Sequence, residues 1–540
     1  MEAFAALLDR LVYTGSRNAK LALIARYLQE TPDPDRGWAL AALTDGLDFA
    51  AVKGSTIRNL MADRVDPVLW ALSRDFVGDT AETASLLWPE PVSDVMPPPT
   101  VSQAVELLGN MTRANARTEL ARLLDRLDPS GRYALLKMAT GAMRIGISAR
   151  LGKVAFAQAF DVSVDEVEEY WHGLQPPYAE LFAWAAEGAD PPDTGSLPLF
   201  RPFMLAHPLE ETVVSMEEYA AEWKWDGIRV QLVHADNDSG GETRLYSRSG
   251  DDISATFPEL LPALSIPAVL DGELLVRGSH QGGESGPDKQ GGAASFNALQ
   301  QRLGRKTVSK KMLAEAPAFV RLYDALVIEG EDLRALPWSE RRDRLEQFLP
   351  RLPVEHFDLS RIVDAEDFAQ LAQIREAARD DAIEGLMLKR RDSPYVAGRR
   401  TGLWYKWKRD PLLIDAVLMY AQRGSGKRSS FYSDYTFGCW AGDPDEGAEL
   451  LPVGKAYSGF TDEELKKIDR HVRQNTLNRF GPVREVERSL VFEVAFDSVH
   501  LSKRHKSGLA MRFPRIHRIR WDKPAHEADR IAALEKLIRD

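Results

Sequence analysis

Hydrophobic residues recur at helical spacing through the first part of the chain. Stretches such as TELARLLDRLD and AELFAWAAEG place apolar residues three and four positions apart, and strand-like runs are scarce before about residue 185. The pattern predicts an all-α domain. The proline-rich stretch PVSDVMPPPTVSQ interrupts it and ends at a helix start, and a second one, ADPPDTGSLPLFRPFMLAHP, is typical of a linker. We therefore expect the helical domain to span residues 1–200.

The pattern changes after about residue 210. Short β-rich runs such as GIRVQLVHA, AVLDGELLV, AFVRLYDALVI and GLMLKR alternate with helical segments such as SERRDRLEQFL and EDFAQLAQIREAARD. This alternation predicts an α+β domain over residues 201–409. Within it, the segment RGSHQGGESGPDKQGGAAS at 277–295 is glycine-rich, polar and without periodicity. It predicts a disordered surface loop, to which we assign no role.

The last part of the chain is again rich in short strands. LLIDAVLMYAQ, YTFGCWAG, ELLPVGKAYSG and SLVFEVAFDSV each have strand character, and one helix is expected to start at Thr461, with Glu464 three residues further on as in a capping box. About five strands with a single helix are typical of a small β-barrel such as an OB-fold. We expect this third domain to span residues 410–540. No internal repeat is visible.

Composition narrows the class of protein. At 540 residues the chain is too long for one core, and it contains no apolar run of the length that a membrane span requires. The N-terminus lacks the basic region and cleavage site of a secretion signal, and the lone Cys439 excludes a disulfide framework or a cysteine-based zinc site. We expect a cytoplasmic protein.

The charge of the chain is acidic overall but unevenly distributed. The formal net charge is −12, yet KRHKSGLAMRFPRIHRIRWDK at 503–523 contains eight Lys or Arg and one acid. A second basic stretch, KRRDSPYVAGRRTGLWYKWKR, lies at 389–409. Such local patches favour contact with phosphates, although two solvated strand faces would show the same pattern.

The stretch EWKWDGIR at 222–229 holds a lysine between two tryptophans. One interpretation is a strand whose Lys224 points to solvent while the tryptophans pack on the other face. The other is a lysine that loses its proton and acts as a nucleophile, which a partly buried amine can do. The motif alone does not decide between them.

Nucleotidyl transfer requires a nucleophile, cations for the phosphates, carboxylates for a metal and a site for the base. In chain order the sequence offers the nucleophile Lys224, the phosphate or ribose contacts Arg229 and Arg248, the acid Glu273, the stacking residue Tyr323, the acid Glu384, the apolar wall Met387, and the cations Arg400, Lys406 and Lys408. Each alone has a plainer interpretation. Tyr323 could be a core aromatic, Glu273 and Glu384 turn or surface acids, and Arg248 a turn residue; their joint order favours the chemistry.

These stretches resemble a known family of enzymes. KWDGIR, SRSG, LDGEL, LYDAL, EGLMLK and WYKWK are similar, in order and character, to the motifs of the covalent nucleotidyltransferases, which include ATP-dependent ligases and capping enzymes. SFNALQQRLGRK, VGKAYSGFTDEEL and SGLAMRFPRIHRIRWDK resemble three-domain ATP-dependent DNA ligases of archaea, eukaryotes and some bacteria. The helical part, with GRYALLKMATGAMRIGIS, is similar to their DNA-binding domain.

The resemblance implies a role for each motif. Lys224 would attack the α-phosphate of ATP and carry AMP, and Lys408 would touch that phosphate. Glu222 would hold the adenine or ribose edge. Glu273 would hold the ribose and, with Glu384, a Mg²⁺ or Mn²⁺ ion. We expect a crowd of cations, together with partial burial, to favour the neutral form of the Lys224 amine; these cations are Arg229, Arg248, Arg400 and Lys406.

The resemblance also implies how the third domain and the substrate take part. Arg512, Arg515 and Lys523 would orient pyrophosphate in the first step, so the OB-fold would have to close over ATP and later grip DNA. Plain phosphate-backbone contact is the alternative for these cations. Arg144 is expected either to touch the DNA backbone or to form a surface salt bridge. The expected partners are ATP and nicked double-stranded DNA, for a monomeric enzyme.

Other functions stay open at this point. An RNA ligase or a GTP-using capping enzyme shares the early motifs but not the helical domain or the RFPR-type tail. An NAD-dependent ligase would need zinc-binding cysteines that the chain lacks. A non-catalytic module that only binds nicks would have no need of the lysines and glutamates together. We expect a prokaryotic source, and the DNA pathway (replication, repair or recombination), the preferred metal and any protein partner are left undecided.

Overall fold

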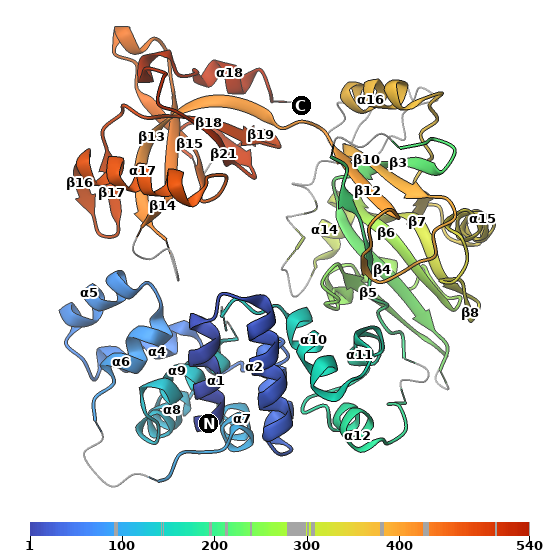
Figure 1. The fold of residues 1–540 in the computed structure, drawn as a ribbon, viewed down its shortest axis with the longest axis horizontal. Helices are drawn as coiled ribbons and strands as arrows, with labels where there is room; N and C mark the ends of the chain where they lie inside the picture. The colour runs from blue at the N-terminus through green and yellow to red at the C-terminus, as the bar shows by residue number, and fades with distance from the viewer. Residues whose placement is uncertain are drawn as a thin grey trace. The chain divides into compact units, whose positions relative to one another are not determined.

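The structure is a computed structural model (Figure 1). It describes residues 1–90, 96–141, 143, 145–193, 197–210, 214–237, 240–277, 299, 302–303, 308–378, 383–424, 431–502 and 505–538. Two features expected from the sequence lie outside the described residues: Arg144, and the glycine-rich segment after Arg277. None of the described helices is long and apolar enough to cross a membrane.

The chain forms two compact units, and each unit combines segments that are distant in the sequence. One unit contains Met1–Ala6, Asp48–Ala142 and Asp410–Asp540. The other contains Leu7–Leu47 and Met143–Arg409. The predicted domain boundaries at 200 and 409 stay predictions.

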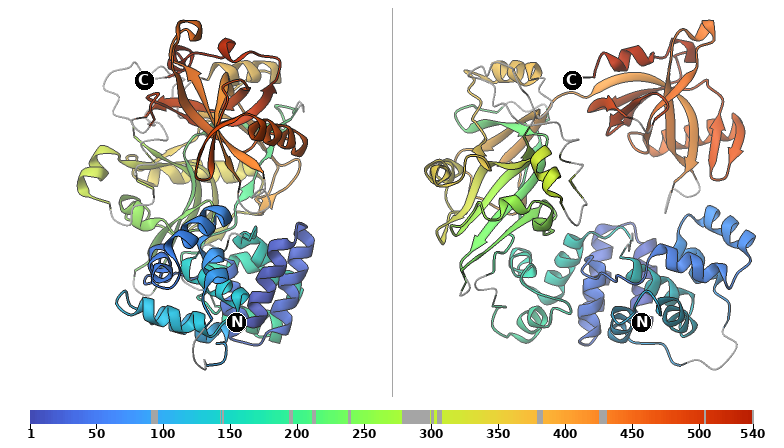
Figure 2. Two further views of the ribbon diagram at one scale, coloured as in Figure 1. Left: turned by 90° about the vertical axis from the view of Figure 1, so that its left-hand side faces the viewer. Right: turned by 180° about the vertical axis from the view of Figure 1, so that it is seen from behind.

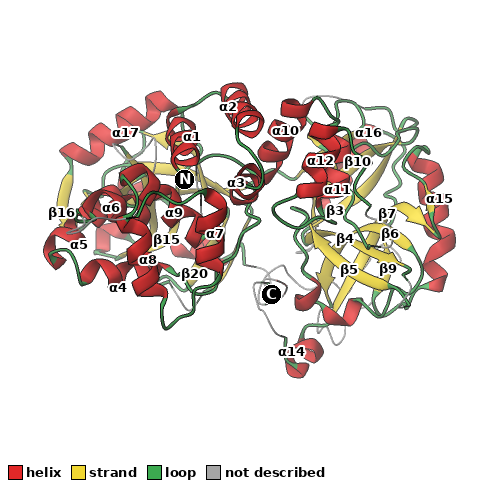
Figure 3. Cartoon of the chain, turned by 90° about the horizontal axis from the view of Figure 1, so that it is seen from below, coloured by secondary structure: helices red, strands yellow, loops and turns green. Residues whose placement is uncertain are grey.

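The N-terminal part is helical, as expected, and no strand occurs among its described residues before Met204 (Figure 3). Its helices are α1 (Glu2–Tyr13), α2 (Arg17–Glu30), α3 (Asp35–Leu43), α4 (Gly54–Ala62), α5 (Pro67–Val77), α6 (Thr80–Leu87), α7 (Val101–Gly109), α8 (Ala116–Asp125), α9 (Pro129–Thr140), α10 (Ala149–Phe160), α11 (Val164–Trp171) and α12 (Ala179–Glu187). Side-chain caps explain several starts: Asp66, Asp128 and Ser148 each accept a hydrogen bond from a backbone N–H of the first turn.

Two β-sheets build the part that contains the candidate chemistry. The first has the order β2-β12-β10-β3, and the second has the order β5-β4-β6-β7-β8 with β9 on β7. The strands of the first are β2 (His207–Pro208), β3 (Tyr219–Trp225), β10 (Ile383–Arg390) and β12 (Trp404–Lys408), while the short β1 (Met204–Leu205) pairs with β11 (Gly398–Arg399). Those of the second are β4 (Ile228–Ala235), β5 (Glu242–Ser247), β6 (Ala268–Val276), β7 (Ala318–Ile328), β8 (Glu331–Asp332) and β9 (Phe357–Leu359).

The two sheets pack face to face. One buried cluster combines Ala220 and Trp404 of the first sheet with Val233, Val269 and Leu326 of the second. On the outer faces, α15 (Trp338–Phe348) packs along β7 and α16 (Phe368–Ala377) along β10 (Figures 1 and 2). The short helix α14 (Lys310–Glu315) precedes β7. Polar residues that alternate with the apolar ones therefore share the inner faces.

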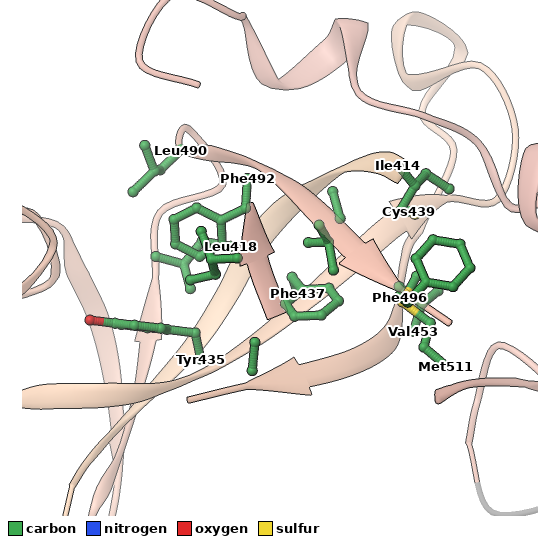
Figure 4. Close-up of a cluster of buried hydrophobic side chains, with 14 of the residues drawn as sticks. Ile414, Leu418, Tyr435, Phe437, Cys439, Val453, Leu490, Phe492, Phe496 and Met511 are labelled. Carbon is green, nitrogen blue, oxygen red and sulfur yellow. The ribbon is translucent and has the colours of Figure 1, made fainter. Parts of the chain in front are cut away.

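The C-terminal part is a strand-rich barrel, as predicted for an OB-fold. Its sheet has the order β15-β14-β13-β17-β16, and β18 joins β13 to β21. Its elements are β13 (Leu412–Arg423), β14 (Tyr432–Trp440), β15 (Leu450–Ala456), α17 (Asp462–Gln474), β16 (Thr476–Phe480), β17 (Val483–Val486), β18 (Val491–Phe496), β19 (Ser498–Leu501), β20 (Leu509–Arg512), β21 (Arg515–Arg520) and α18 (Ile531–Glu535). Figure 4 shows its core, where Phe437, Phe492 and Phe496 are fully buried. The capping box of Thr461 and Glu464 is confirmed.

Candidate active site

Lys224 lies on β3, on the face opposite its two flanking tryptophans. The indole Nε1 of Trp225 donates to the Ser360 hydroxyl at 3.1 Å, and Trp223 packs against the cluster under α16. The Lys224 side chain is 22% exposed and is ion-paired with the Glu384 carboxylate. The tryptophans therefore pack on the far face as the plainer interpretation has it, but the lysine does not simply point to solvent.

A glycine lets two lysines flank one carboxylate. Gly385 of β10 pairs with Lys224 on one side and with Lys408 on the other. A Cβ on Gly385 would lie 2.2 Å from the carbonyl oxygen of Trp407, and its φ of +148° is one that L-residues rarely adopt. Glu384 falls where the β10–β3 register slips, and such a bulge re-aims a side chain. Its carboxylate lies 3.2 Å from Lys408 Nζ as well as against Lys224.

The two acids of the site have opposite electrostatics. Burial would raise the pKa of Glu384, but attraction by Lys224 and then Lys408 outweighs it and lowers the pKa to about 2. Glu273, on β6, has a pKa raised to about 7, chiefly by burial; repulsion from Glu384 adds to the rise and Lys224 opposes it. Glu384 is thus held as an anion. The positive charge around Glu273 is too small to compensate its carboxylate in the same way.

The expected crowd of cations around Lys224 stays a prediction. The direct ionic partner of the Lys224 amine in the structure is a carboxylate, that of Glu384. Arg229 is engaged elsewhere: it donates to Asp271 at 3.0 Å and to the carbonyl of Met204 at 2.6 Å. The sequence gives the order of these cations along the chain. It does not show that a buried acid such as Asp271 pairs with one of them.

Gly227 explains the glycine of the KWDG stretch. It lies in the turn between β3 and β4, and a Cβ there would come within 2.5 Å of the Leu274 carbonyl and 2.8 Å of Cγ of Glu273. Only a glycine allows the turn to approach β6 this closely. The turn therefore brings Glu273 into the neighbourhood of Lys224, which acts electrostatically on it.

The residues expected at the base share one end of the site. Met387 pairs with Glu222 on β3 and with Lys406 on β12, so these three side chains share one face. Tyr323 stands at an irregularity of β7 and is partly exposed. Two cations that sequence reasoning missed hold Glu222: Lys389 at 3.2 Å and Arg342 at 3.4 Å. Lys389 is the last residue of the EGLMLK stretch and follows Met387 by two positions. On a strand this spacing places both side chains on the same face, which is the signal in the sequence that could have identified Lys389.

The remaining cations divide into two groups. Arg248 and Lys408 both lower the pKa of Lys406, after the larger effects of burial and Arg399, so these side chains are near one another. Arg400 is exposed, and its neighbour Arg399 is one of the charges that lower the pKa of Lys406.

The three cations predicted in the OB-fold are partly engaged with acids. Arg515 pairs with Asp497 at 3.2 Å, and Lys523 pairs with the nearly buried Asp415 at 2.7 Å. Arg512 lies against the exposed ring of Phe513, at 5.0 Å from its centroid. These contacts lie within the barrel, and they leave the proposed pyrophosphate role of the three residues as a prediction.

Within the described ranges, no cluster of three or more His, Cys, Asp or Glu forms a ready metal site. The donor chemistry nevertheless suits a hard divalent cation, since Glu273 and Glu384 offer carboxylate oxygens. The raised pKa of Glu273, to which Glu384 and Asp226 both contribute, shows acidic charge that a cation would neutralise. The residues present therefore fit Mg²⁺ or Mn²⁺.

Comparison with known proteins gives a consistent result. Residues 203–408 match the family described as ATP dependent DNA ligase domain, and residues 428–523 match the ATP dependent DNA ligase C terminal region. The whole chain is 32% identical to a probable DNA ligase of Koribacter versatilis, over 96% of that protein. A probable DNA ligase of Anaeromyxobacter sp. is 37% identical, over 77% of this chain and 78% of its own. A solved structure titled Pmar-Lig_PreS3 shares the fold over 96% of this chain and 99% of its own, with a TM-score of 0.57 at 15% identity.

The facing sheets, with Lys224 and Lys408 on either side of the Glu384 carboxylate, agree with the class of covalent nucleotidyltransferases. The match along the full length of a relative narrows this class, and the chain belongs to the ATP-dependent DNA ligases. These enzymes seal 5′-phosphate/3′-hydroxyl nicks in duplex DNA through a lysyl-AMP and an adenylylated DNA intermediate. The predicted fold class and enzyme class are confirmed.

Proposed function

We propose that Lys224 is the residue that carries AMP. The observation that supports this most directly is the shared contact of Lys224 and Lys408 with Glu384. In the first step Nζ would attack the α-phosphorus of ATP. A P–N bond forms, the P–O bond to pyrophosphate breaks, and the amine proton passes to water. The 5′-phosphate of a nick would then take AMP from Lys224, and the 3′-hydroxyl would displace AMP to join the strands.

Glu384 orients the amine and does not act as the proton acceptor. A carboxylate whose pKa is about 2 is too weak a base to deprotonate an ammonium group. The ion pair has to open and the ammonium has to pass a proton to water before attack, because an ammonium has no free lone pair. Binding of ATP is the event that opens the ion pair, because the phosphates bring negative charge close to Glu384 and Lys408.

The cations proposed to contact the phosphates include two lysines of β12, Lys406 and Lys408. Lys408 shares the Glu384 carboxylate with Lys224 and is assigned to the α-phosphate, where negative charge grows in the transition state. Lys406 and Arg248, which lie near each other, are assigned to phosphates further along. The other cations expected at the phosphates or ribose are Arg229, Arg400, Arg512, Arg515 and Lys523. Arg229 would act from its anchored position beside Asp271.

Glu273 and Glu384 would hold Mg²⁺, or Mn²⁺. When bound, the ion supplies positive charge that stabilises the triphosphate and its leaving group. Glu273 is also placed for the ribose hydroxyls. The base would lie between Tyr323 and Met387, with its amino edge toward Glu222.

The substrate is nicked duplex DNA, and we propose a monomeric cytoplasmic enzyme. The family supplies the substrate class. Basic stretches on an acidic chain agree with binding to phosphates.

Covalent labelling tests the assignment of the nucleophile. Wild-type protein incubated with α-³²P ATP and Mg²⁺ should acquire an acid-labile label, and Lys224→Ala should not. Lys311→Ala is the matched control, because Lys311 is 81% exposed and lies in the same unit. Label on Lys224→Ala would refute the assignment. Nick sealing with ATP, NAD and GTP, on DNA and RNA nicks, tests the substrate class in the same preparations.

A further inference from the structure

Three charges are buried together beside the site expected to hold the base. Glu222 is 1% exposed, Lys389 is 2% exposed and Arg342 is 4% exposed. Lys389 Nζ lies 3.2 Å from one Glu222 oxygen, and Arg342 lies 3.4 Å from the other. A charge so fully buried is stable only when it is paired, so Lys389 and Arg342 together compensate the Glu222 carboxylate.

Both cations are fixed by other contacts. Lys389 also donates to the carbonyl of Tyr323 at 3.3 Å, and its Nζ lies 4.5 Å from the centroid of the Tyr323 ring and 4.8 Å from that of Trp404. Arg342 donates from Nε to Glu346 at 2.7 Å along α15. Cations anchored in this way determine where the carboxylate of Glu222 can point.

A carboxylate can distinguish purines by the group that they carry at C6. It accepts hydrogen bonds only, and its two oxygens offer about four acceptor positions, of which the cations use one on each. The free positions can accept from the 6-amino group of adenine. The 6-oxo group of guanine or hypoxanthine would face them acceptor to acceptor, which is repulsive.

We propose that Lys389 and Arg342 are positioning residues for adenine selection, which hold the Glu222 carboxylate as a correctly directed acceptor for the 6-amino group. The proposal rests on the proposed contact between Glu222 and adenine. Lys389 connects the two parts of the proposed base site. It donates to the Glu222 carboxylate, which would contact the edge of the base, and to the carbonyl of Tyr323, whose ring would cover the face of the base.

The test measures lysyl-nucleotide formation by the full-length enzyme with three substrates. They are ATP, purine riboside triphosphate, which carries hydrogen at C6, and inosine triphosphate, which carries oxygen there. Lys389→Met is compared with Arg390→Met, a matched control on the next residue whose partner, Asp392, is largely exposed. Thermal unfolding of each variant checks the fold. Arg342→Met, with the exposed Arg344 replaced by Met as its control, provides a second pair if Lys389→Met does not fold.

We expect Lys389→Met to lower kcat/KM for ATP by about 10- to 100-fold, the worth of one hydrogen bond to a charged group, with a much smaller loss for purine riboside triphosphate. The preference for ATP over inosine triphosphate should fall in parallel. Arg390→Met should retain the wild-type ratios, and Lys389→Arg should restore most of the preference. In a Glu222→Gln background, Lys389→Met should reduce the ratios no further.

Two results would overturn the proposal, and they are distinguishable. If Lys389→Met lowers the rates with all three nucleotides equally while Glu222→Gln abolishes the preference, Lys389 has a structural role only and the contact of Glu222 with adenine stands. If Glu222→Gln leaves the preference for ATP unchanged, the proposed contact itself is wrong, and the positioning role is refuted with it. Neither result bears on Lys224.

Discussion

Glu273→Gln should stabilise the ligand-free protein at neutral and alkaline pH. Glu273 is partly buried on β6, and burial is the main cause of its pKa of about 7. Glu384 and Asp226 repel its negative charge, and Lys224 and Arg229 compensate only in part. Glutamine has the size of the protonated acid but cannot ionise, so the substitution removes the unfavourable charge without creating a cavity.

The magnitude follows from the difference between the folded and unfolded pKa. The ordinary value is 4.5 and the folded value is about 7, which corresponds to about 3 kcal/mol at 1.36 kcal/mol per pH unit. Because Glu273 is partly exposed, solvent screening reduces this to about 1–3 kcal/mol. Below pH 4.5 the acid is protonated in both states and contributes nothing. As the pH rises from about 4.5 to about 7, the unfolded state loses its proton before the folded state does, so the wild type loses stability over this window.

The assay is urea unfolding of wild type and Glu273→Gln between pH 4 and pH 8.5, followed by tryptophan fluorescence without nucleotide or metal. The free-energy difference should be near zero at pH 4 and should grow to about 1–3 kcal/mol in favour of the variant at pH 8. Glu331→Gln, at an exposed surface pair with Arg344, should follow the wild type at every pH. A difference between Glu273→Gln and wild type that does not change with pH would refute the electrostatic account of this site.

Three further predictions concern the geometry of the site and the substrate. Gly385→Ala puts a Cβ 2.2 Å from the Trp407 carbonyl, so we expect a lower Tm and at least about tenfold slower lysyl-AMP formation; Gly402→Ala, which meets nothing within 4 Å, should show no such loss of rate. Lys408→Met should lower kcat for lysyl-AMP formation by about 10- to 100-fold in single-turnover quench assays, because charge on the α-phosphate loses its partner; an unchanged kcat would contradict that role. Nick affinity, measured by fluorescence anisotropy, should fall steeply with salt as counterions are released, and a flat response would exclude extensive phosphate contact.

Local patterns predicted most elements correctly, because their causes lie within a few residues. The run AVLDGELLV coincides with β6, and AFVRLYDALVI coincides with β7. The helix expected at Thr461 begins there because its capping box is encoded within four residues. Strand propensity and helix caps are readable in one sequence, since neither depends on which distant segment packs alongside.

The pairing of charges could not be predicted in the same way. The contacts of Lys389 and Arg342 with Glu222 join three elements, β10, α15 and β3, whose register is set by the whole domain. The ion pair between Lys224 and Glu384 depends on a bulge next to Gly385, which leaves no local signal in the sequence. A list of motif residues therefore identifies the members of the site, but it does not say which charges compensate one another.

The compensation pattern itself distinguishes the roles of the two acids. Pairs of titratable groups whose surroundings drive their pKa values apart mark different functions in one site. Glu384, with its pKa near 2, is already neutralised by two lysines, so a ligand that engages it must displace one of them, and the proposed nucleophile Lys224 is one of the two. Glu273, with its pKa near 7, has no such partner among the described residues and gains most from an arriving cation or hydroxyl donor. We therefore expect cation binding at Glu273 and release of Lys224 from Glu384 to be coupled, because an arriving cation supplies positive charge that the ligand-free site lacks.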